Sequence, residues 1–124
     1  MMIALRVVLA LLGVVFVFVG LQFLTDPVTM GADFGLTPIG NGGLSTLRAD
    51  MTSFFWVSGG ALLIGAWRGR GAYFLVTAAL MGIVFAARCL SLALDGPYDD
   101  WQMPMAVEAV TVILCCFAAW RMRD

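Results

Sequence analysis

Four stretches of the chain are long and apolar enough to cross a lipid bilayer, which takes about 20 residues of helix. They cover approximately residues 4–24, 47–67, 72–94 and 101–120. Pro104 stands in the first turn of the last stretch, where its missing N–H costs no hydrogen bond. The pattern predicts an all-α protein, an integral membrane bundle of four transmembrane helices that forms a single domain over residues 1–124.

The first apolar stretch is also compatible in position with a cleaved signal peptide. It lacks a small-x-small cleavage site before "TDPVTM", and its apolar core is longer than the about 7–15 residues of a signal sequence. We therefore expect a retained helix.

The longest segment without a predicted span covers residues 25–45. Asp26 is a candidate N-cap, and Pro27 follows at the first helical position. We expect a short helix here that lies in the membrane interface. The following "TPIGNGG" predicts flexible or tightly turned backbone.

Charged residues outside the predicted spans separate by sign. Arginines flank the cytoplasmic ends of membrane helices in most proteins. Here they precede the first span, form the turn 68–71 and follow the last span, at Arg6, Arg68, Arg70, Arg121 and Arg123. The other two loops carry aspartates instead, at Asp26, Asp33, Asp95, Asp99 and Asp100. We therefore expect both termini on the cytoplasmic side and both acidic loops outside.

Composition agrees with a membrane location. Hydrophobic residues make up 62% of the chain and the mean hydropathy is +0.98, whereas soluble domains contain about 45–50% apolar residues. Membrane lipid is thus an expected partner. The net charge is only -1 and no basic run occurs, so nucleic acid is not expected to bind.

The residue types needed for common enzyme mechanisms are scarce. The chain has no histidine, no glycine-rich phosphate loop and no metal-binding motif. Cys89, Cys115 and Cys116 are expected to be buried thiols that act as small apolar groups. We therefore expect a non-catalytic protein without a cofactor or a metal.

Charged residues inside the predicted spans fall at one depth. Arg88 lies seven residues before Asp95, which is roughly 10 Å along a helix, and Glu108 lies equally far into the last span. Arg48 and Asp50 occupy the first turns of the second span. A charged side chain at the bilayer centre costs about 2.5–3.5 kcal/mol. Mutual neutralisation explains the common depth, and we expect Arg88 to pair with Glu108.

The other charged residues of this layer point in different directions. Residues two apart on a helix point about 200° away from each other, so Arg48 and Asp50 cannot share a face. We favour Asp50 pointing inward toward Arg88, with Arg48 outward or on the rim. Ser91 lies near Arg88 on the same helix face.

Two interpretations of this layer compete. In one, the charges fix how the helices associate, and Arg88 extends its side chain toward the surface. In the other, they line a pocket open to the outside that binds an anionic or amphipathic molecule, as ionisable residues within membranes often do. The candidate ligand-binding residues are Arg88, Glu108, Asp50, Arg48 and Ser91.

The segments "LRADMTSFF" and "RCLSLALDG", with a glutamate early in the last span, resemble the bacterial membrane proteins grouped as domain of unknown function 4345. The resemblance places the family pattern on Arg48, Ala49, Asp50, Arg88, Asp95, Gly96 and Glu108. It implies a small protein of four helices, in the inner membrane of a bacterium, whose charged layer is a shared feature.

Three functions remain open at this point. The first is an accessory or scaffold subunit of a larger membrane complex, or a binder of a lipid-like molecule in the outer leaflet. The alternative is a small homo-oligomeric transporter or carrier of an anionic or amphipathic solute, in which Arg88 holds the anion and Glu108 changes its protonation state. A membrane enzyme acting on a lipid or quinone comes third.

Overall fold

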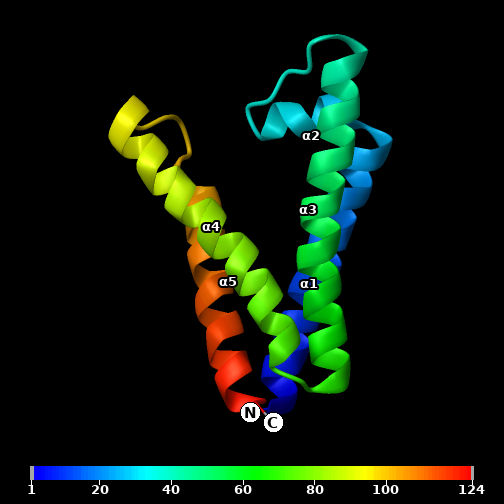
Figure 1. Ribbon diagram of the computed structural model, residues 1–124, viewed down its shortest axis with the longest axis vertical. Helices are drawn as coiled ribbons and strands as arrows, with labels where there is room; N and C mark the ends of the chain where they lie inside the picture. Colours follow the sequence, from blue (N-terminus) through cyan, green and yellow to red (C-terminus); the bar gives the residue numbers. More distant parts are fainter. Residues whose placement is uncertain (1, 124) are drawn as a thin grey trace.

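Five helices make up most of the computed structural model, which describes residues 2–123 (Figure 1). They are α1 (Met2–Thr25), α2 (Pro27–Asp33), α3 (Gly40–Arg68), α4 (Ala72–Asp95) and α5 (Gln102–Arg121). No strand occurs among these residues. The predicted all-α class is therefore confirmed.

The four long helices form two antiparallel pairs (Figure 1). α1 packs along α3, α4 packs along α5, and α3 also contacts α4. The pairs meet near the turn between α3 and α4 and spread apart toward the opposite end, so that the molecule resembles a V.

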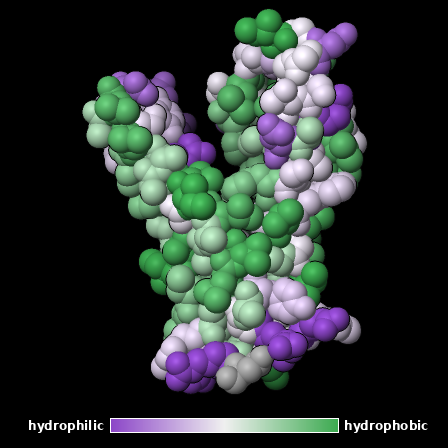
Figure 2. All heavy atoms as spheres, viewed as in Figure 1, coloured by the Kyte–Doolittle hydropathy of each residue, from purple (hydrophilic) through white to green (hydrophobic). Residues whose placement is uncertain are grey.

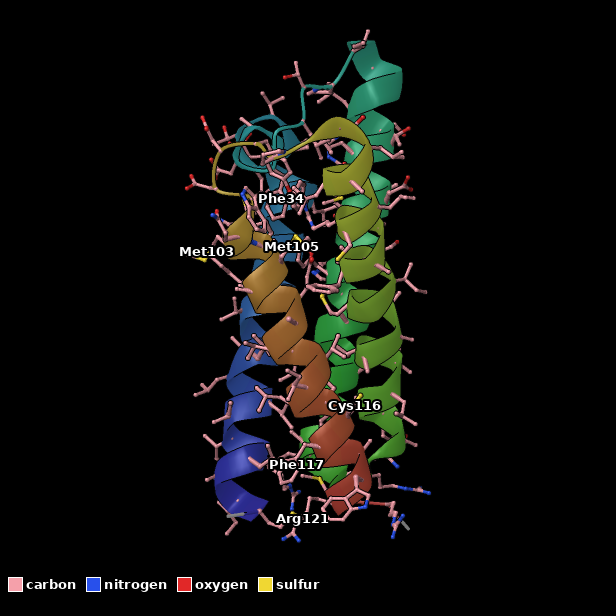
Figure 3. All side chains as sticks on the ribbon, turned by 90° about the vertical axis from the view of Figure 1, so that its left-hand side faces the viewer. Phe34, Met103, Met105, Cys116, Phe117 and Arg121 are labelled. Atoms are coloured by element: carbon pink, nitrogen blue, oxygen red, sulfur yellow. The ribbon has the colours of Figure 1, made fainter. Side chains whose placement is uncertain are left out.

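The two ends of the molecule carry opposite charges, as the loop pattern predicts, and Figure 2 shows hydrophilic residues gathered at both ends. We call one the basic end: it includes the start of α1, the α3–α4 turn and the end of α5, with Arg6, Arg68, Arg70, Arg121 and Arg123. We call the other the acidic end: it includes α2 and the α4–α5 loop, with Asp26, Asp33, Asp95, Asp99 and Asp100. Figure 3 shows Arg121 at the basic end of α5, and Met103 near its other end projecting away from the bundle.

The α1–α3 interface is a direct contact between two backbones. A Cβ added to Gly59 would lie 2.7 Å from the carbonyl oxygen of Gly13, and one added to Gly13 would lie 2.9 Å from the carbonyl oxygen of Gly59. Small residues at a helix crossing permit this approach, which maximises van der Waals contact within a membrane.

Polar side chains of α3 donate hydrogen bonds to carbonyl oxygens of α1. Thr52 Oγ1 bonds to Gly20 O at 3.2 Å, and Trp56 Nε1 bonds to Val17 O at 3.0 Å. From the other side, Thr77 Oγ1 of α4 donates to a carbonyl of α3 at 2.7 Å. The polar groups of the central helix thus find partners inside the bundle.

The segment before α3 confirms one prediction and corrects another. Asp26 caps α2, accepting from Thr29 N at 3.4 Å, and Pro27 occupies the first helical position. However, α3 begins at Gly40 rather than near residue 47, so the "GNGG" segment is helical. Once the later turns are fixed by packing on α1, each added residue contributes a backbone hydrogen bond at little further cost, which offsets the low helix propensity of glycine.

Three helices are long and apolar enough to cross a membrane: α1, α4 and α5. Large apolar side chains cover their outer surfaces, as expected for contact with lipid, among them Ile3, Leu11, Phe18, Ile83, Leu94 and Ile113. These features indicate a membrane protein. The predicted span 47–67 lies within α3, which is long but less apolar.

Candidate functional site

The predicted partners Arg88 and Glu108 contact each other across the α4–α5 pair. Arg88 Nε donates to Glu108 Oε2 at 2.8 Å, a distance typical of a charge-assisted hydrogen bond. The Arg88 side chain is 30% exposed, whereas the Glu108 side chain is 9% exposed. The glutamate thus lies in the bundle and the arginine reaches it from a more open position.

Tyr98 is a further member of this cluster that the sequence did not identify. Its hydroxyl oxygen accepts from Arg88 Nη1 at 3.2 Å. Gly96 ends α4 with φ 87, a conformation that glycine adopts readily, and the short loop then turns back toward α5. The signal was the loop length: a connection this short keeps Tyr98 close to the ends of both helices.

One oxygen of the buried glutamate lacks a partner. Glu108 is 6% exposed as a residue, and its Oε1 atom has no hydrogen-bond donor among the described residues. Leaving a buried acceptor unpaired costs about 1–3 kcal/mol, and more for a charged group. The described residues therefore satisfy only part of the hydrogen-bonding capacity of the Glu108 carboxylate.

Arg48 and Asp50 form no hydrogen bond or ion pair with this cluster among the described residues. Arg48 Nε donates to Leu24 O of α1 at 2.8 Å, while Asp50 is exposed. Arg48 lies four residues before Thr52, on the face of α3 that packs on α1, and the final carbonyls of α1 have no acceptor role inside their own helix. That carbonyl end attracts the guanidinium, which turns Asp50 away from α1.

Ser91 is likewise engaged elsewhere. Its Oγ bonds to Asp95 Oδ2 at 3.3 Å, one turn farther along α4. The cluster therefore consists of Arg88, Glu108 and Tyr98, rather than the five residues predicted. We call these three residues the charged cluster.

The cysteines and acidic groups of the described residues form no metal-binding constellation. Cys115 is buried, as predicted for all three thiols, whereas Cys89 and Cys116 are exposed on the outer faces of α4 and α5. In a helix that faces lipid, an exposed position is still an apolar one, which is compatible with a thiol.

An apolar groove lies near the charged cluster. It runs between α1 and α5, has a volume of about 500 Å³ and is lined by Val8, Leu11, Leu12, Val15, Ala106, Val107, Val110, Thr111 and Leu114. Thr111 lies one turn from Glu108 along α5, on the side of the basic end. Its hydroxyl bonds to Val107 O of its own helix at 2.7 Å and leaves the groove apolar.

Comparison with known proteins identifies a family. The family model described as "Domain of unknown function (DUF4345)" matches residues 4–119. No curated protein and no solved structure matches the chain.

Proposed function

This chain belongs to the family of domain of unknown function 4345, and we propose that it is a non-catalytic inner-membrane protein that binds a lipid-like molecule in the outer leaflet. The polar head of that molecule would bind at the charged cluster, and its apolar part would lie along the groove between α1 and α5. The observation that carries the proposal is the buried Glu108 with one unpartnered oxygen, held by a partly exposed arginine.

The proposal requires that α3 cross the membrane together with the three apolar helices. Its 29 residues have a helical length of about 43 Å, more than the roughly 30 Å of a hydrocarbon core. Its lower hydropathy fits a central helix, because the polar groups of Thr52 and Trp56 donate to carbonyls of α1 and are thereby satisfied within the protein. The concentration of arginines supports a cytoplasmic location for the basic end.

Cysteine labelling tests this topology. Single cysteines placed at Asp99 and at Arg123 in a cysteine-free background lie at opposite ends of the molecule. In spheroplasts, whose outer membrane is removed and whose inner membrane is intact, a membrane-impermeant maleimide should label position 99 and leave position 123 unlabelled. Labelling of both positions or the reverse pattern would exclude the proposed orientation.

The chemistry of the charged cluster supports an amphipathic ligand rather than a purely apolar one. Arg88 is the partly exposed member and can donate to a phosphate or carboxylate oxygen, whereas the unpartnered Oε1 of Glu108 accepts from a donor such as a hydroxyl or an ammonium group. Tyr98 is 46% exposed and adds a hydroxyl beside it. Figure 2 shows a notch between the two helix pairs at the acidic end, the end at which the loop carrying Tyr98 lies.

Transport receives less support from the same geometry. A carrier needs polar groups along a path through the bilayer. Between Glu108 and Arg121, the polar side chains of α5 are Thr111, bonded to its own helix, and two cysteines. A ligand bound at the charged cluster therefore has no polar path toward the basic end along α5.

The decisive experiment measures what remains bound to the protein. We expect wild-type protein, purified from native membranes in a polymer nanodisc, to retain one amphipathic species enriched over bulk lipid by mass spectrometry. Arg88→Gln and Glu108→Gln should each reduce that enrichment about tenfold, the factor for the ~1.4 kcal/mol typical of a lost charge-assisted hydrogen bond.

Asp50→Asn provides the matched control, because it removes a charge from the same half of the molecule at an exposed position. This variant should retain the enriched species. If wild type carries only bulk lipid, or if Asp50→Asn loses as much as Arg88→Gln, the proposed site does not exist. A protein that co-purifies with all variants would instead favour the role of an accessory or scaffold subunit.

A further inference from the structure

A second groove lies at the basic end, between the start of α1 and the end of α3. Its volume is about 760 Å³, within the range of ligand-binding clefts. It is lined by Ile3, Arg6, Val7, Ala10, Leu63, Ile64, Ala66, Trp67, Arg68 and Tyr73. It shares no lining residue with the α1–α5 groove and lies at the opposite end from the charged cluster.

The groove has a polar mouth and an apolar interior. Arg6 and Arg68 lie near the ends of their helices at the basic end. Ala10 lies roughly 6 Å farther along α1 than Arg6, and Ile64 lies roughly 6 Å farther along α3 than Arg68, in the direction of the acidic end. Charge therefore changes to hydrocarbon over one helical turn, as it does from the headgroup to the acyl chains of a lipid.

Arg6 is held in place with hydrogen-bonding capacity to spare. Its Nε donates to Ala66 O at 2.6 Å and its Nη2 donates to Trp67 O at 2.7 Å. These are carbonyls of the last turn of α3, which lack acceptor roles within the helix. Nη1 donates to no described residue and lies beside Gly69, where an added Cβ would be 3.4 Å away. The guanidinium is thus rigidly oriented with one nitrogen available.

Charge complementarity selects the occupant. Arg68 is exposed at the mouth, and the described acidic residues all lie outside the basic end. Trp67 is 85% exposed and Tyr73 is half-buried at the same level, as aromatic residues are at a membrane interface. An arginine near a membrane surface attracts an anionic lipid with a free energy of about 1 kcal/mol.

We propose that this groove binds one anionic phospholipid of the leaflet at the basic end, with its phosphate between Arg6 and Arg68 and one acyl chain along Val7, Ala10, Leu63 and Ile64. The site is independent of the charged cluster. Its occupant would tie the start of α1 to the end of α3, adding to the two hydrogen bonds that Arg6 donates there.

The test uses the full chain in nanodiscs of equimolar phosphatidylglycerol and phosphatidylcholine, released into native mass spectrometry. Wild type should retain phosphatidylglycerol in preference. Arg68→Gln should reduce that preference about fivefold, the factor for ~1 kcal/mol. Arg123→Gln is the matched control, since it removes an exposed arginine of the same end that does not line the groove, and it should leave the preference unchanged.

A second variant tests the groove without altering charge. Ile64 is 45% exposed, so Ile64→Trp should fold while its larger side chain fills the interior. We expect it to lose most retained phosphatidylglycerol. Equal preference in Arg68→Gln and Arg123→Gln would overturn the proposal in favour of general surface charge. Full retention in Ile64→Trp, or complete displacement of the lipid by inorganic phosphate, would overturn the role of the acyl chain.

Discussion

The α1–α3 pair and the α4–α5 pair are both antiparallel, but different contacts hold them together. In the first pair, two glycines bring the backbones into contact, and side chains of α3 donate to carbonyl oxygens of α1. In the second pair, the side chains of Arg88 and Glu108 form an ion pair between the helices, and at the basic end the backbone N–H of Gly71, just before α4, donates to Met122 O at 3.1 Å. The first interface brings two glycine backbones together in the middle of the helices, whereas the second joins its helices through charged side chains in the half nearer the acidic end.

This difference distinguishes polar groups that hold two helices together from polar groups that are suited to binding a ligand. Each interhelical donor of the α1–α3 pair reaches a carbonyl oxygen, so its polar groups are satisfied within the protein. The α4–α5 pair keeps a buried carboxylate oxygen without a donor. Partly satisfied polar networks are costly, and natural proteins retain them mainly at functional sites.

The largest effect is expected from breaking the ion pair. Arg88→Leu leaves the Glu108 carboxylate buried without a counter-ion, and loss of one partner of a buried pair costs about 3–5 kcal/mol. Because Arg88 is partly exposed, we expect a value near the lower end, about 3 kcal/mol. Reversible unfolding in mixed micelles measures this change in the free energy of unfolding.

The double variant Arg88→Leu/Glu108→Leu is the control for this prediction. It removes both charges and should recover most of the stability, while the enriched amphipathic species stays lost. A double variant as unstable as the single one would mean that the pair supplies more than neutralisation.

The next largest effect is expected at the glycine contact of the α1–α3 pair. Gly59→Ala places a Cβ 2.7 Å from the carbonyl oxygen of Gly13, and neither backbone can move without separating the helices. Overpacking of this kind costs about 1–3 kcal/mol, so we expect about 2 kcal/mol by the same unfolding assay.

Gly60→Ala is the matched control, because an added Cβ at this neighbouring position meets no atom within 4 Å. It should be neutral or slightly stabilising, since alanine favours the helix more than glycine does. Equal losses in Gly59→Ala and Gly60→Ala would contradict a role for backbone contact.

These contacts also mark how far the sequence predicts the structure. The lengths of the apolar stretches predicted the positions of the long helices, and the charges of the loops predicted which helix ends lie at the same end of the molecule. The pairing of Arg88 with Glu108 followed from equal depth on adjacent antiparallel helices. These inferences needed only the rise per residue of a helix and the cost of an unpaired charge. Both depend on the position of a residue along the helix axis and not on its direction around that axis.

The errors concern rotation about a helix axis. Depth placed Asp50 beside Arg88, but Gly59, Thr52 and Arg48 set the α1-facing side of α3, and Asp50 is exposed and makes no contact with Arg88. Tyr98 was missed because loop conformation decides where its hydroxyl lies. Periodicity gives the relative direction of two residues, while the neighbour that each one faces depends on tertiary packing.

A smaller effect is expected from Arg48, which the structure assigns to the α1–α3 pair. Arg48→Met removes the donor to Leu24 O at the carbonyl end of α1, an interaction typically of about 0.3–1 kcal/mol. If Arg48 lies outside the charged cluster, its effect adds to that of Arg88→Leu. A coupling energy above about 0.5 kcal/mol in the double-mutant cycle would place it in the cluster after all.

The smallest effect distinguishes a hydroxyl between helices from one within a helix. Thr52→Val removes the donor to Gly20 O of α1, and interhelical hydrogen bonds in membrane proteins average about 0.6 kcal/mol. Thr111→Val is the matched control, because Thr111 is also buried but its hydroxyl bonds to Val107 O of its own helix, whose carbonyl already accepts a backbone hydrogen bond. Losing it should change the free energy of unfolding by little. A larger loss at Thr111 than at Thr52 would mean that α5 depends on polar contacts more than α3 does, which would reverse the contrast between the two pairs.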